Sequence, residues 1–295
     1  MVVLDSSNVT NTIMMAINEI FAKIFASIDN DLYAILDDFT FIDSTILDDK
    51  LFHKLFGMSA GDGILLIANS LIFGFLIYYG FRLLFSHLGI TEAERPSKFI
   101  FKLIVFGICM NFSFFICEQI IQINSYITIA LRTLGEMLYS HSISFSVLIT
   151  KLNTVVALNE NTIDIFSLNG ILKSLVSFGI LNLAISYAVR YILIKIFVLI
   201  SPFAIISLSV KSSSVFFKAW LKSLISLLFI QDFIVIVLLL IFSLNLSSSN
   251  LFSKFVLVSS IFILIKSNHY VKELLGGIST DVSMGIQGLK SLFNR

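Results

Sequence analysis

Charged side chains are scarce in this sequence of 295 residues, as are proline, cysteine and histidine. Only 13% of the residues are charged and 57% are hydrophobic, with a mean hydropathy of +0.96. Soluble domains carry about 25% charged residues, so lipid must surround much of this chain. The net charge of +1 also gives no electrostatic basis for wrapping nucleic acid.

The few residues that bind metals or act as nucleophiles are also poorly placed for chemistry. Cys109 and Cys117 share one apolar stretch without CxxC spacing, and the four histidines fall in separate regions without an HExxH pattern. The sequence has no GxxxxGK[ST] phosphate loop, and its GxSxG match at 57–61 precedes an apolar stretch rather than following a strand. We therefore predict no catalytic residue, no metal site and no cofactor, and we do not expect an enzyme.

Long apolar stretches dominate what is present. A helix needs about 20 residues to cross roughly 30 Å of hydrocarbon at about 1.5 Å per residue. The sequence predicts an all-α, polytopic membrane protein with about five transmembrane helices. The predicted spans are 64–88, 99–123, 171–208, 221–246 and 251–270.

The third stretch, 171–208, is too long for one simple crossing. It is either one helix that projects beyond the bilayer or two spans joined near Arg190. No glycine, proline or polar turn cluster interrupts the sequence between Ser186 and Lys195, which favours one helix.

Basic residues decide the orientation, because they gather on the cytoplasmic side of membrane proteins. Five spans place eleven of them together: Arg82, Arg95, Lys98, Lys102, Lys211, Lys218, Lys222, Lys266, Lys272, Lys290 and Arg295. The acidic region 1–63 is then external, whereas a sixth span would remove this bias. We predict an external (periplasmic) region 1–63, a transmembrane domain 64–270 with an external segment 124–170, and a cytoplasmic tail 271–295.

The external region begins with a helical pattern. Isoleucine and valine recur every three or four residues between Val9 and Ile28, opposite Asn11, Asn18 and Lys23. This predicts an amphipathic helix that packs on a partner or lies at the membrane surface.

Ionisable side chains inside the spans each cost about 2.5 to 3.5 kcal/mol, so each needs a partner or a purpose. Counting about 1.5 Å per residue from the cytoplasmic ends gives two polar layers and predicts two ion pairs, Lys195 with Asp232 and Arg190 with Glu118. Such pairs either fasten spans together or line a polar path, and the sequence does not separate these roles. The mid-membrane layer holds Lys195, Asp232, Asn111 and Tyr79, and the outer layer holds Arg190, Glu118 and Asn69.

The stretch 201–231 reads SPFAIISLSVKSSSVFFKAWLKSLISLLFIQ and contains Pro202, Lys218, Trp220 and Gln231. A proline near a helix end, a basic loop, and a helix starting with aromatic, lysine and tryptophan residues resemble the TrbL/VirB-six-like inner-membrane subunits of type IV secretion systems. The resemblance extends to the plan of external N-terminus, about five spans and internal C-terminus. Trp220 also stands at the predicted cytoplasmic boundary, where tryptophan anchors helices at the interface.

The resemblance implies a channel or scaffold subunit in the bacterial inner membrane that helps to move DNA or protein across the envelope. It also implies partner ATPases and other secretion subunits, several copies in a larger complex, membrane lipid around the spans and transient contact with the cargo. The alternatives are a small-solute secondary transporter or other permease, and an intramembrane enzyme. A transporter is disfavoured because no inverted repeat is evident and neither Pro96 nor Pro202 is central in a span, and an enzyme because only Asp232 is acidic at mid-membrane.

The predicted orientation can be tested by labelling single introduced cysteines from outside intact cells. A cysteine at position 45 should react with an impermeant maleimide, whereas a cysteine at position 215 should react only after the membrane is opened. The reverse pattern would overturn the orientation.

Overall fold

The computed structural model describes residues 6–58, 63–90, 94–156, 164–210, 213–244 and 250–276, and these residues form helices without any strand. Five helices are long and apolar enough to cross a membrane, which confirms the all-α, multi-pass membrane architecture. They are α3 (Ile64–His87), α5 (Ser113–Tyr139), α7 (Leu168–Ile206) with its 3-10 extension to Ser209, α8 (Ser214–Ser243) and α9 (Leu251–Leu275). The other helices are α1 (Ser6–Thr40), η1 (Ser44–Leu47), α2 (Lys50–Phe56), α4 (Pro96–Asn111), α6 (Phe145–Val156) and η2 (Ser207–Ser209).

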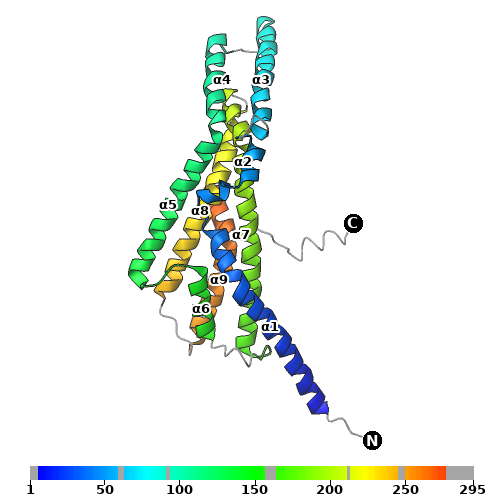
Figure 1. Cartoon of the computed structure of the whole chain (residues 1–295), viewed down its shortest axis with the longest axis vertical. Helices are drawn as coiled ribbons and strands as arrows, with labels where there is room; N and C mark the ends of the chain where they lie inside the picture. Colours follow the sequence, from blue (N-terminus) through cyan, green and yellow to red (C-terminus); the bar gives the residue numbers. More distant parts are fainter. Residues whose placement is uncertain are drawn as a thin grey trace.

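The helices form an elongated bundle with α7 and α8 at its centre (Figure 1). Helices α5, α8 and α9 pack around α7, whereas α3 and α4 pair at one end of the molecule and α1 leaves the bundle toward the other. Most side chains of α3 face outward, including Phe73 and Ile77 at 70% and 62% exposed. A helix that is apolar all round and unburied by protein is a helix surrounded by lipid.

The second predicted span differs from the structure. Instead of one helix over 99–123, the chain forms α4 and α5, which meet at Phe112. The side chain of Asn111 turns back to donate to the Gly107 carbonyl at 2.8 Å and also bonds to Asn69. A polar side chain that competes for a helix carbonyl in this way favours a bend.

Helix α7 is a single helix of 39 residues, about 58 Å long at 1.5 Å per residue. Pro202 lies near its end and has no N–H to donate to the carbonyl of Val198. The hydroxyl of Ser201 donates to that carbonyl instead, at 2.7 Å. The helix can therefore continue through the proline without leaving the Val198 oxygen unpaired.

The N-terminal region contributes residues to the main core of the bundle. Helix α1 covers the predicted amphipathic stretch and continues to Thr40, and the chain then enters the main core. Leu36, Ile42, Leu47 and Phe56 are at most 3% exposed. At Gly63 a side chain would meet the Leu55 carbonyl at 2.6 Å, and φ is +104°, so only glycine fits the approach to α3.

The segment predicted as external, 124–170, is folded where it is described. Helix α5 runs on to Tyr139, and α6 follows after a short turn. The apolar side chains of Leu148 and Leu152 on α6 are 0% and 1% exposed and belong to the main core. The segment therefore packs on the bundle instead of forming a separate unit.

Close packing of α7 on α9 depends on Gly179, where an added Cβ would lie 2.8 Å from Ile261. We predict that Gly179→Val lowers the free energy of unfolding by about 1 to 3 kcal/mol through overpacking. Gly80→Val on α3, where nothing lies within 4 Å, is the matched control and should leave stability unchanged. Denaturant unfolding in detergent micelles measures both, and equal effects at the two positions would contradict this packing.

Candidate functional site

A cluster of buried polar side chains lies where the end of α1 meets α5, α7 and α8. Its members are Arg190, Gln231, Asp232 and Thr128, which are 0%, 1%, 1% and 3% exposed. Buried polar groups are costly unless they are hydrogen-bonded, so their partners show what the cluster does.

Gln231 is the centre of the cluster. Its Oε1 accepts from the Ile42 N–H at 3.1 Å and from Arg190 Nη2 at 2.8 Å. Its Nε2 donates to the Ile42 carbonyl at 3.2 Å and to Thr128 Oγ1 at 2.9 Å. All four hydrogen bonds open to a glutamine amide are made, and two of them pair with the Ile42 backbone as a neighbouring strand would.

Arg190 joins the end of α1 to α8. Its Nη1 donates to the Thr40 carbonyl at 3.0 Å, and its Nε donates to the Leu227 carbonyl at 2.8 Å. Thr40 is the last residue of α1, where a helix exposes unpaired carbonyls and partial negative charge. Arg190 therefore caps α1 from inside the bundle, a role that its planar fork of donors suits.

Asp232 completes the cluster on the side of α5. Its Oδ1 accepts from the Thr128 hydroxyl at 2.5 Å, whereas its Oδ2 is buried and has no hydrogen-bond partner within the described residues. Thr128 Oγ1 also lies 3.1 Å from the carbonyl of Asn124. A chain of hydrogen bonds thus runs from Arg190 through Gln231 and Thr128 to Asp232.

Neither predicted ion pair is present. Arg190 bonds to Gln231 and backbone carbonyls instead of Glu118, and Asp232 bonds to Thr128 instead of Lys195. The Lys195 ammonium lies 5.2 Å and 5.5 Å from the ring centres of Tyr191 and Phe52. Glu118 is half-buried on α5, and no contact within the described residues joins it to Arg190.

The predicted depths failed because α8 begins at Ser214, seven residues before the predicted start at 221. Asp232 is therefore about 27 Å from Ser214, and Arg190 is about 24 Å from Ile206, at 1.5 Å per residue. The two residues stand at one level rather than about 14 Å apart. The earlier start also brings Gln231 opposite Arg190.

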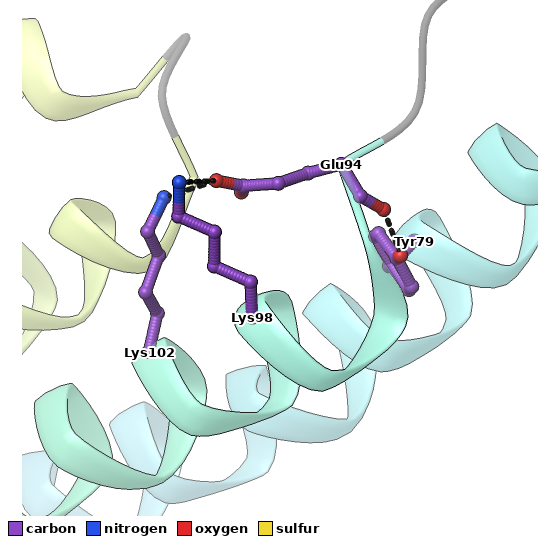
Figure 2. A network of polar contacts seen from close by, with 4 residues as sticks. All are labelled: Tyr79, Glu94, Lys98 and Lys102. Atoms are coloured by element: carbon purple, nitrogen blue, oxygen red, sulfur yellow. Dashed lines mark hydrogen bonds and ion pairs between the residues drawn. The ribbon is translucent and has the colours of Figure 1, made fainter.

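The remaining members of the predicted layers lie elsewhere. Asn69 and Asn111, which were assigned to different layers, bond to each other between α3 and α4 at 3.2 Å. Tyr79 lies toward the tip of this pair of helices, where its hydroxyl donates to the Glu94 carbonyl (Figure 2). Its ring stacks on Phe99 with centres 3.9 Å apart.

Glu94 ties the tip of α3 and α4 together. Figure 2 shows one carboxylate oxygen of Glu94 facing the ammonium groups of both Lys98 and Lys102, at 3.7 Å and 2.6 Å. The hydrogen bond from Lys102 holds the pKa of Glu94 below its ordinary value, against the effect of partial burial. The ion pairs are therefore complete at neutral pH and are lost only as the pH falls through that lowered pKa.

Three of the four residues singled out in the stretch 201–231 are buried in this structure: Pro202, Trp220 and Gln231. Trp220 is 3% exposed, and its indole N–H donates to the Phe197 carbonyl at 2.9 Å. It therefore lies between α7 and α8 instead of anchoring in the lipid interface. Lys218 is exposed and, with Lys222 and Leu275, lines a shallow hollow of about 320 Å³.

Sequence reasoning missed one member of the cluster, Thr128, and two residues whose backbone bonds to it, Thr40 and Ile42. Thr128 lies in the segment predicted as external, and Thr40 and Ile42 contribute only backbone atoms. A backbone contact leaves no trace in residue type, so no sequence pattern identifies it. The signal that was available is Gln231 beside Asp232 in an otherwise apolar helix, since adjacent polar residues there need partners.

No group of three or more metal-binding side chains gathers among the described residues. The cluster instead holds one arginine and one carboxylate in a closed hydrogen-bonded chain, which can hold helices together or take up a proton. Comparisons with protein-family models, with curated proteins and with solved structures find no match to this chain.

Gln231→Leu should lower the free energy of unfolding by about 2 to 4 kcal/mol, because each buried backbone group left unpaired at Ile42 costs about 1 to 3 kcal/mol. Gln122→Leu on α5, where the amide bonds only to exposed or half-buried neighbours, is the control and should change stability by less than about 0.5 kcal/mol. Denaturant unfolding in lipid nanodiscs compares the two. Equal losses would argue against a special role for Gln231.

Proposed function

We propose that this protein is a multi-pass subunit of the channel or scaffold of a type IV secretion system in the bacterial inner membrane. It helps DNA or protein to cross the envelope, and partner ATPases supply the energy. It works as one of several copies within a larger complex, surrounded by lipid and in transient contact with the cargo.

The observation that supports this role most is how the buried polar residues are used. A permease for small solutes needs polar groups that are available to a substrate near the midplane. In the Arg190 cluster the donors and acceptors bond mainly to each other and to backbone groups of Thr40, Ile42 and Leu227. An internal fastening of this kind is what a scaffold subunit requires.

The exposed faces of α3 and α4 give further support. These two helices extend beyond the facing ends of α7 and α8 (Figure 1). Many of their apolar side chains are exposed. The stretch 201–231, which carries the resemblance to the secretion subunits, locks α7 to α8 through Trp220 and Phe197. That region therefore helps to hold α7 against α8, which is consistent with a structural role for this stretch.

Deleting the gene in its native host should abolish contact-dependent transfer of DNA or protein to recipient cells. Trp220→Ala should reduce transfer at least about ten-fold, because it leaves a cavity and an unpaired site beside Phe197, while Trp220→Phe should keep most of the packing and more of the transfer. Membrane levels of each variant, measured by immunoblot, separate lost transfer from lost insertion. Normal transfer in the deletion strain, with altered uptake of a solute, would favour a permease.

A further inference from the structure

The buried carboxylate of Asp232 has an unusual environment. It is 1% exposed, one of its oxygens has no hydrogen-bond partner among the described residues, and it shares a hydrogen-bonded chain with the fully buried Arg190. A carboxylate in this position is ionised only while the nearby arginine balances its charge. The pair is needed for neutrality, yet no direct ion pair joins the two groups.

Thr128 allows Asp232 to exist in either protonation state. A hydroxyl carries one hydrogen, and two acceptors lie within reach of Thr128 Oγ1: Asp232 Oδ1 at 2.5 Å and the Asn124 carbonyl at 3.1 Å. With Asp232 ionised, the hydroxyl donates to the carboxylate. With Asp232 protonated at Oδ1, the carboxyl donates to Thr128, and the hydroxyl turns to the Asn124 carbonyl.

Rotation of one hydroxyl therefore accommodates a proton without losing a hydrogen bond. The Gln231 bond to Thr128 survives in both states, because the hydroxyl oxygen accepts it in either orientation. What changes is charge: the cluster holds a net charge of zero when Asp232 is ionised, and the charge of Arg190 is unbalanced when Asp232 is neutral. A buried guanidinium whose charge is not balanced is stabilised if water reaches it.

The end of α1 and Ile42, which lies shortly after it, are bonded directly to the Arg190 cluster. The guanidinium bonds to the Thr40 carbonyl, and Gln231 bonds to both backbone groups of Ile42. Separation of this segment from α7 and α8 would break these bonds and let water reach the guanidinium. We propose that Asp232 is a proton-binding site and that loading it releases the end of α1 from the bundle.

Other charged or titratable groups on the helices packed around α8 must be distinguished from Asp232. Asp37 on α1 accepts from the Phe145 N–H at 2.9 Å, and burial raises its pKa. On α9, His269 is exposed and pairs with Glu273 at 3.1 Å. Further titratable or charged groups on the packed helices include Tyr187, Arg190 and Lys195 on α7, Arg132 on α5 and Tyr270 on α9.

The direction of the pH response follows from charge. Asp232 must be ionised to balance Arg190, so the docked state of α1 is favoured at higher pH and is lost as the pH falls and the proton binds. Because one proton is taken up, the ratio of docked to released molecules should fall by at most about ten-fold per pH unit. A steeper response would indicate more than one site.

Spin labels on α1 and α7 test the proposal in the full chain. Labels at Ile20→Cys and Ile192→Cys, both exposed, are placed in a background with Cys109→Ala and Cys117→Ala, and the protein is reconstituted in nanodiscs. The pulsed-EPR distance should be single and narrow at about pH 8 and broad at about pH 5. Asp232→Asn, which carries no charge, should be broad at both, whereas Glu118→Gln on α5 should behave as wild type.

Each other result overturns the proposal. A wild-type distance that stays narrow at low pH, or a pH response that persists in Asp232→Asn, excludes Asp232 as the proton site, and the second outcome points to Asp37 or His269.

If Asp232→Asn does not fold, two variants of Thr128 replace it. Thr128→Val removes the donor to the ionised carboxylate and should move the midpoint of release up by about one pH unit, whereas Thr128→Ser should leave it unchanged. Equal midpoints in these two variants would refute the role of the site.

Discussion

The position of the chain at Thr40–Ile42 depends on the hydrogen bonds that Gln231 and Arg190 make to its backbone. The end of an amphipathic helix carries unpaired carbonyls, and a non-helical residue such as Ile42 has both backbone groups to satisfy. Gln231 pairs with both groups of Ile42, and Arg190 takes the last carbonyl of α1. With these bonds made, the following apolar residues Ile46, Leu47 and Phe52 can be buried.

These hydrogen bonds also explain why the polar side chains of Arg190, Gln231 and Thr128 are found inside the bundle. Arg190 and Gln231 are held by backbone atoms from α1 and α8 and by Thr128 from α5, so four segments meet at one point. Lipid offers no hydrogen bonds, and polar side chains inside a membrane domain are stabilised only by each other or by backbone. The members of the cluster are bonded to each other and to backbone atoms, which joins the four segments. Among the described residues, Asp232 Oδ2 is the one acceptor of the cluster that has no hydrogen-bond partner.

A second structural theme is the replacement of missing backbone donors by neighbouring side chains. Pro202 removes a donor from α7, and Ser201 replaces it at the Val198 carbonyl. Trp220 then bonds the adjacent carbonyl of Phe197 and joins α8 to the same turn. The stretch that resembles the secretion subunits thus has a physical role in this chain, which is to join two central helices where one of them contains a proline.

Composition and hydropathy alone were enough to predict the all-α membrane architecture and the number of long apolar helices, because burial in lipid imposes a length and a polarity on every crossing segment. The absence of glycine, proline and polar turns between Ser186 and Lys195 favoured one continuous third span, and the structure has one helix there. Partners of polar residues were not predictable in the same way. Depth estimates need exact helix starts, and a seven-residue error at α8 separated Arg190 from Gln231 and Asp232. The backbone atoms of Thr40 and Ile42 have no sequence signature at all. Only the tertiary structure could bring them to Gln231, since hydrogen bonding to backbone depends on where the chain passes and not on which residue passes there.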